Sequence, residues 1–233
     1  RIVGTASDNG TIAANSTSNT VSLRGGTLQL AEHDFGPSAD FTLADSTNST
    51  VETDAVNATL AGSLSGSGSL TKSGTGILTL NAANTYTGTT TISAGTLALG
   101  ASGTLSQSSS ISVANGAVFD VSSVGNFTLG SGQTLGGTGT ISGALTISSG
   151  ATLAPGNSPG TLAAGDTIFS PGGTYEWQIN DATGTAGTNW DLLSIIGTLD
   201  LSALADADGS RFTFSLVSLS PDNTAGLLAH FNP

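Results

Sequence analysis

Four carboxylates near the C-terminus come closest to a catalytic set in type and spacing: Glu176, Asp181, Asp191 and Asp200. Paired carboxylates can hydrolyse glycosidic bonds, one acting as an acid and the other as a base or nucleophile. A polysaccharide lyase would also need a basic residue, and Arg211 is the only Lys or Arg after Lys72. We therefore interpret the four carboxylates as solvated strand ends and keep a carbohydrate-active enzyme as the alternative.

A second candidate is the segment Asp206-Ala207-Asp208-Gly209-Ser210, which begins like a calcium-binding loop. A complete loop needs further oxygen ligands and a closing Glu, and no Glu follows this segment. The sequence favours a structural turn over a metal site. The chain has no cysteine, which excludes disulfides, thiolate metal sites and thiol catalysis.

The two histidines, His33 and His230, are far apart in the sequence. No Ser-His-Asp order can be built from them, and we expect both at the surface. We assign no catalytic, cofactor-binding or metal-binding residue, and we expect no cofactor.

Threonine pairs of the type Thr-x-Thr suggest an ordered hydroxyl array of the kind that binds ice. They occur at Thr85/Thr87, Thr89/Thr91, Thr138/Thr140 and Thr183/Thr185. Their irregular spacing predicts that the pairs do not stack on one face, so an ice-binding solenoid is a weaker alternative.

Charge limits the partners of this chain. The net charge is −12, and the only basic residues are Arg1, Arg24, Lys72 and Arg211. Binding of nucleic acid or of an anionic membrane needs clustered Lys and Arg, so we expect neither partner. No apolar run is long enough for a membrane span. Arg1-Ile2-Val3-Gly4 resembles a strand and turn rather than a signal peptide, and we interpret the chain as part of a longer protein.

The elements that must carry these residues are short β-strands. Segments such as Ile77–Leu80, Thr96–Leu99 and Leu145–Ser148 alternate apolar and small polar residues, which indicates one buried face and one exposed face. Gly, Ser or Asn interrupts each strand within a few residues. Gly-Thr-Leu recurs along the chain, and the coarse period of roughly 20 residues favours a β-solenoid over a sandwich.

The corners of such a coil need residues that tolerate a left-handed backbone. The 33 glycines supply most of them. Asparagine can take the same conformation and can also stack on asparagine in the next coil. We expect this of Asn81, Asn84, Asn115 and Asn126.

The stretch from Gly68 to Leu97 closely resembles the autotransporter-associated β-strand repeat. The motif consists of Leu70-Thr71-Lys72, Gly74-x-Gly76, Leu78-Thr79-Leu80, Asn84-x-Tyr86-x-Gly88 and Ala94-Gly95-Thr96-Leu97. Residues 151–162 are similar to a segment that often follows such repeats, and residues 175–201 are similar to the last coils before the end of such proteins. The resemblance implies parallel β-helix coils, export and exposure on the bacterial surface. It carries over no catalytic residues.

We therefore predict an all-β protein, a right-handed parallel β-helix (β-solenoid) with a wider, aromatic-rich C-terminal capping region. The expected regions are irregular coils over 1–57, regular repeats over 58–165 and terminal coils or a cap over 166–233. The predicted function is that of a secreted bacterial cell-surface stalk for display or adhesion, not an enzyme. Expected partners are surface polysaccharide, host or matrix contacts, and further copies of the chain assembled into fibres.

Overall fold

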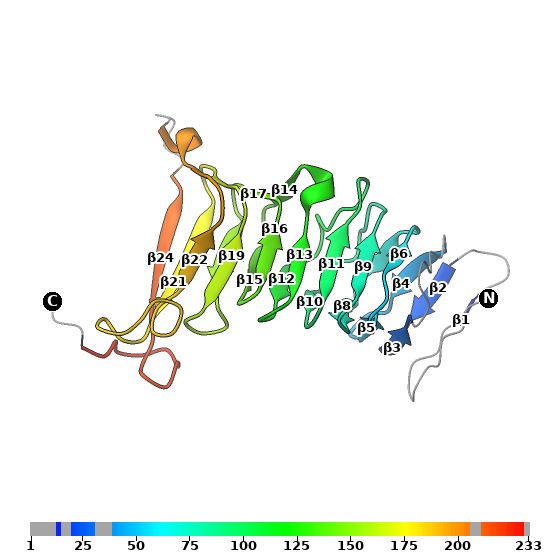
Figure 1. Ribbon diagram of the computed structural model, residues 1–233, viewed down its shortest axis with the longest axis horizontal. Coiled ribbons are helices and arrows are strands. Elements are labelled where there is room, and N and C mark those ends of the chain that lie inside the picture. Colours follow the sequence, from blue (N-terminus) through cyan, green and yellow to red (C-terminus); the bar gives the residue numbers. More distant parts are fainter. Residues whose placement is uncertain (1–12, 15–19, 31–38, 206–210, 231–233) are drawn as a thin grey trace. The chain divides into compact units, whose positions relative to one another are not determined.

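The computed structural model describes residues 13–14, 20–30, 39–205 and 211–230 of the chain. Regular structure in these residues consists of β-strands, together with the short 3₁₀ helices η1 (Ser122–Val124) and η2 (Ser202–Ala205). The strands form the parallel β-solenoid that the sequence predicts (Figure 1). The chain divides into two compact units, Arg1–Gly125 and Asn126–Pro233, which we describe separately.

In the first unit three sheets share the strands. One holds β1 (Ala13–Ala14), β2 (Thr20–Leu23), β4 (Asp40–Leu43) and β7 (Leu64–Gly66). The second holds β3 (Gly26–Gln29), β5 (Asn48–Glu52), β8 (Ser69–Ser73), β10 (Thr90–Ile92) and β12 (Ser110–Val113). The third holds β6 (Ala58–Leu60), β9 (Ile77–Leu80), β11 (Thr96–Leu99) and β13 (Val118–Asp120). Neighbouring strands run parallel, except that β1 pairs with β2 antiparallel.

The second unit repeats this arrangement. One sheet holds β14 (Asn126–Leu129), β17 (Ala144–Ile147), β20 (Thr167–Phe169) and β23 (Leu199–Asp200). Another holds β15 (Thr134–Gly137), β18 (Thr152–Pro155), β21 (Thr174–Ile179) and β24 (Thr213–Ser218). The third holds β16 (Thr140–Ser142), β19 (Thr161–Ala164) and β22 (Leu192–Ile195).

Alternation of side chains builds the core. In β11, Leu97 and Leu99 are buried while Thr96 and Ala98 between them are partly exposed. Buried residues stack in register from coil to coil: Leu97 pairs with Leu78 in the preceding coil and with Phe119 in the following one. β11 and the strands it pairs with therefore add apolar side chains to a narrow column, and the column is buried because coils stack.

Glycine makes the close corners possible. Gly74 has a φ of 76°, which side chains rarely permit, and a Cβ at Gly76 would collide with the carbonyl oxygen of Val56 in the preceding coil. This accounts physically for the Gly-x-Gly of the repeat. The expected left-handed asparagines are not found, because none of Asn81, Asn84, Asn115 and Asn126 has a positive φ. Most of the described residues with a positive φ are glycines.

The coil length changes along the chain. Asn84 contacts Leu64 and Thr104, each 20 residues away, which matches the predicted period. In the second unit Gly160 contacts Asp191 across 31 residues, and Asp166 contacts Thr198 across 32. The terminal coils are thus wider, as predicted, and the aromatic side chains of Phe169, Tyr175 and Phe212 cluster there. The structure does not test the three predicted region boundaries, which stay predictions.

Membrane-crossing helices are not found in the described ranges, since none of their helices is both long and apolar enough.

Candidate functional site

A lysine occupies a core position in the repeat coil. Lys72 pairs with Val51 and Ile92 in the coils on either side, and its side chain is fully buried. Its ammonium donates hydrogen bonds to the carbonyl oxygens of Ser73 at 2.7 Å, Gly74 at 2.8 Å and Ala94 at 3.2 Å. Burial lowers the pKa of Lys72 to about 8, and the charge of Glu52 opposes this shift. Lys72 therefore fastens the corner of its own coil to the next one.

Asn84 connects three successive coils. Its Oδ1 accepts a hydrogen bond from the backbone N–H of Leu64 at 2.9 Å. Its Nδ2 donates to the carbonyl oxygens of Ala82 at 2.8 Å and of Thr104 at 3.0 Å. The side chain is 1% exposed, so these three bonds replace the water that the amide would otherwise bind.

A buried hydroxyl chain lies beside it. The hydroxyls of Tyr86 and Thr90 are 2.5 Å apart, and those of Thr90 and Ser108 are 2.8 Å apart. Ser108 also donates to the carbonyl oxygen of Gly88 at 3.0 Å. Burial raises the pKa of Tyr86, so its phenol stays protonated and this row of hydroxyls carries no charge. The buried polar residues of the repeat motif, Lys72, Asn84 and Tyr86, thus take part in hydrogen bonds inside the stack of coils.

The outer face of the β3–β5–β8–β10–β12 sheet carries one hydroxyl per strand in the same register. We call this row the hydroxyl ladder: Thr27, Thr50, Thr71, Thr91 and Ser112. All five side chains are partly exposed. Because neighbouring strands are about 4.8 Å apart, the ladder presents donors and acceptors at that regular spacing. Asn48 extends it sideways, since its Nδ2 donates to the Thr71 hydroxyl at 3.0 Å.

The second unit carries a shorter row of the same kind on the outer face of its β15–β18–β21–β24 sheet. Thr134 pairs with Thr152, which pairs with Thr174, which pairs with Thr213. These in-register rows were missed by the Thr-x-Thr criterion, which compares residues within one strand. The signal that could have found them is a threonine recurring once per coil, as at Thr50, Thr71 and Thr91.

Asp191 is the one predicted carboxylate that is buried, at 2% exposed. Its Oδ1 accepts a hydrogen bond from the N–H of Gly160 and its Oδ2 accepts one from the N–H of Gln178, both at 2.8 Å. Burial raises the pKa of Asp191 to about 6. The two hydrogen bonds oppose this rise, and the charge of Glu176 adds to it. The carboxylate therefore joins the loop before β19 to strand β21.

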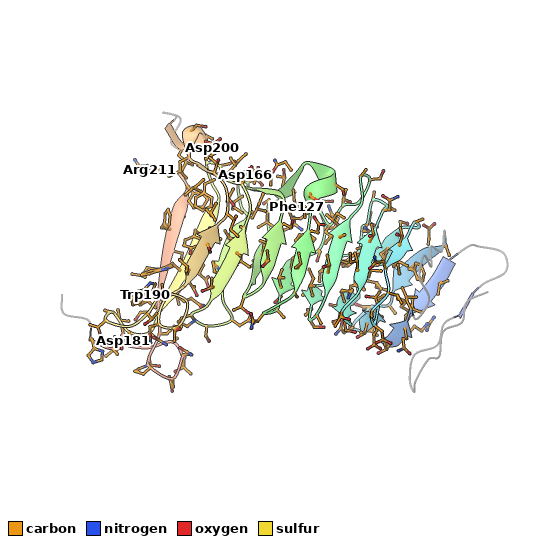
Figure 2. All side chains as sticks on the ribbon, viewed as in Figure 1. Phe127, Asp166, Asp181, Trp190, Asp200 and Arg211 are labelled. Atoms are coloured by element: carbon orange, nitrogen blue, oxygen red, sulfur yellow. The ribbon has the colours of Figure 1, made fainter. Side chains whose placement is uncertain are left out.

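Asp181 and Asp200 each form hydrogen bonds of their own. Asp181 accepts a hydrogen bond from the N–H of Thr183 at 2.9 Å and pairs with His230 at 2.8 Å, and these contacts lower its pKa. Asp200 accepts from the N–H of Ser202 at 2.8 Å. Figure 2 shows Asp181 and Asp200 at opposite corners of the second unit. The four carboxylates thus do not converge on one cleft, although Glu176 is close enough to Asp191 to affect its pKa.

The remaining candidates are the two histidines and the segment Asp206–Ser210. His33 and the segment Asp206–Ser210 lie outside the described residues, so the predicted turn there stays a prediction. Among the residues that the structure describes, no group of three or more His, Asp or Glu side chains is arranged to hold a metal ion. His230 is exposed, as expected.

Comparison with known proteins agrees with the fold. The model of the passenger-associated-transport-repeat family matches residues 70–99, which contain the Lys72, Asn84 and Tyr86 contacts. The BmaC autotransporter adhesin of Brucella suis biovar 1 (strain 1330) is 39% identical over 101 residues. The match covers 42% of this chain and spans only 3% of the adhesin. No solved structure matches the chain significantly.

The matched repeat lies within the first unit. Within it Lys72 and Asn84 form hydrogen bonds between successive coils. Residues 70–99 thus carry a repeat of the passenger-associated-transport family within a β-solenoid, and this repeat and the adhesin relative indicate a secreted, cell-surface protein.

Proposed function

We propose that the chain is a structural, non-enzymatic surface stalk that contributes to adhesion through its hydroxyl ladder. The observation that carries the proposal is the in-register row of five hydroxyls on one outer face. A polysaccharide or a matrix polymer presents repeated hydroxyl and carbonyl groups, which can pair with such a row. Each contact is weak, and several made at once give useful affinity. The adhesin relative supports this role.

The test removes hydroxyls without changing shape. The triple variant Thr50→Val, Thr71→Val, Thr91→Val keeps β-branched side chains on the strands and deletes three hydroxyls of the ladder. We expect its binding to immobilised polysaccharide or extracellular matrix to fall at least about tenfold, because each lost hydrogen bond contributes about 0.5–1.5 kcal/mol.

The matched control is Thr42→Val, Thr59→Val, Thr79→Val, which alters partly exposed threonines on the other two sheets of the same unit. It should bind like the unaltered chain. Equal binding by all three proteins would rule out the ladder as the contact surface. Binding to ice crystals but not to polysaccharide or matrix would favour the ice-binding alternative instead.

Assembly into fibres is a second proposal at the same surface. Lys72 is the only charged residue between Asp54 and Asp120, and its side chain is buried. The exterior of this stretch therefore lacks the charges that keep copies of a protein apart. Electron microscopy at rising protein concentration should show laterally packed filaments, and particles that stay discrete at every concentration would count against it.

A further inference from the structure

Strand β24 reverses the burial pattern of its sheet. Its register places Phe214 on Tyr175 and Leu216 on Trp177, so both side chains belong to the inward-facing row. Tyr175 is 7% exposed, but Phe214 is 69% and Leu216 is 66% exposed. The outward residues Ser215 and Val217 are less exposed than these two. The core side of this strand therefore faces solvent.

The other two sheets of the second unit end in the same way. Ile196, directly after β22, is 75% exposed. Leu199 in β23 is 43% exposed, and Leu201 directly after it is 47% exposed. Among the described strands β24 pairs only with β21, so its second edge offers unpaired backbone groups. An uncovered apolar edge of this kind is a template for another strand.

The chain that follows β24 packs elsewhere. Asn180 donates a side-chain hydrogen bond to Asn223 at 2.6 Å, and Ala229 forms a bridge with Asp181. Leu219 pairs back with Ala225. These contacts direct residues 219–230 to the loop that follows β21. Gly226 bonds Ser218 at the end of β24, and the described residues leave the edge open from Thr213 to Val217.

The described edge strands of the first unit expose no matching apolar row. Strand β1 lies antiparallel on β2 and covers the edge of that sheet. At the edge strand of the neighbouring sheet, Leu28 and Leu30 are 5% and 3% exposed. A head-to-tail contact between copies would therefore lack an apolar surface to receive β24.

Two copies of β24 itself, in contrast, complement each other. The strand Thr213–Ser218 contains no charged residue, so two copies can meet without repulsion even though the chain carries a net charge of −12. We propose that a second copy of the chain docks on β24 tail to tail, with the two strands antiparallel around a twofold axis. Such an interface uses the same patch twice and closes after two copies.

The register follows from the alternation of side chains. Residues directly opposite each other in an antiparallel pair lie on the same face of the sheet. If the axis passes through Ser215, Phe214 lies opposite the partner's Leu216 and Leu216 opposite the partner's Phe214. This arrangement covers both exposed side chains of each copy with aromatic–aliphatic pairs, which stabilise sheets.

Sedimentation equilibrium over a hundredfold range of concentration tests the proposal. Below the concentrations at which filaments form, the unaltered chain should pass from monomer to dimer. Leu216→Lys should stay monomeric at the highest concentration, because it places two ammonium groups in the apolar contact. Leu227→Lys is the matched control, since Leu227 is 90% exposed and lies outside β24, and it should dimerise normally. A monomeric unaltered chain, or a dimer that Leu216→Lys leaves intact, would overturn the proposal.

Cysteine cross-linking tests the register, because the chain contains no cysteine of its own. Under oxidising conditions Ser215→Cys should form a disulfide-linked dimer, since opposite Cα atoms in an antiparallel pair are about 4.5–5.5 Å apart. Thr213→Cys is also on the outer face, but its two copies would lie about 13 Å apart, so it should stay monomeric on a non-reducing gel. Cross-linking at position 213 and not at 215 would refute this register.

Discussion

The buried polar side chains of the repeat coil share one feature: each reaches a neighbouring coil. The Lys72 ammonium contacts the carbonyl oxygen of Ala94, the Asn84 amide contacts Leu64 and Thr104, and Thr90 contacts Ser108. A coil too thin to bury a large apolar core gains specificity of stacking from these bonds. At the level of single residues the repeat motif is therefore a set of links between coils.

Replacing Asn84 with alanine tests this interpretation. The buried N–H of Leu64 would lose its partner, which costs about 1–3 kcal/mol, and the bond to the carbonyl oxygen of the exposed Thr104, worth about 0.5–1.5 kcal/mol, would also be lost. We expect Asn84→Ala to lower the free energy of unfolding by at least about 2 kcal/mol in urea denaturation. The control Asn81→Ala changes the same residue type at an exposed position of the same coil and should shift stability by less than about 1 kcal/mol. Similar losses for both variants would contradict the assigned role.

At the scale of elements, the wide terminal coils depend on Asp191. A 31-residue connection separates Gly160 from Asp191, and the carboxylate bonds hold Gly160 and strand β21 together. The indole N–H of Trp177 adds a bond to the carbonyl oxygen of Asp191 at 2.7 Å. The repeat coils turn at short corners. In the longer terminal coil, the buried carboxylate of Asp191 accepts two backbone hydrogen bonds instead.

The raised pKa of Asp191 gives these coils a pH dependence of known sign. Between about pH 4 and pH 6 the folded chain binds more protons at this carboxyl than the unfolded chain does. The contribution of Asp191 to the free energy of unfolding is therefore greatest below pH 4 and is lost as the pH rises through 6. The stability of the unaltered chain relative to Asp191→Asn should fall over this window in urea denaturation.

Asp200 provides the control of opposite sign. Hydrogen bonds from Ser202 lower its pKa, so its contribution is present above about pH 4 and is lost only as the pH falls below that value. Asp200→Asn should therefore leave the profile between pH 4 and pH 6 unchanged. A profile for Asp191→Asn that runs parallel to that of the unaltered chain would show that Asp191 does not titrate in this window.

The strands and the coil period could be predicted from the sequence because both depend on local patterns. Alternation within Thr96–Leu99 and the recurrence of Gly-Thr-Leu carry that information. The hydroxyl ladder could not be predicted in the same way, since it requires the register between Thr50, Thr71 and Thr91. The burial of Asp191 and the exposure of Phe214 depend on contacts with distant residues, which a single segment does not reveal.

At the scale of the whole molecule, the chain combines an acidic composition with a repeat region that is almost free of charge. The charged residues other than Lys72 lie before and after residues 55–119, while that stretch offers hydroxyls, amides and backbone. Stacked coils convert this composition into ordered outer rows rather than scattered polar groups. A surface protein that makes many weak contacts needs such repetition more than it needs a single binding pocket.

Distances between spin labels along the hydroxyl ladder test the stacked solenoid most directly. The chain contains no cysteine, so labels can be placed in pairs at Thr27 and Thr71, at Thr27 and Thr91, and at Thr27 and Ser112. Stacking at about 4.8 Å per coil predicts Cα separations of about 10, 14 and 19 Å, increasing by one equal step per coil. Separations that fail to increase from pair to pair, as in a sandwich whose strands turn back, would contradict the solenoid and the ladder together.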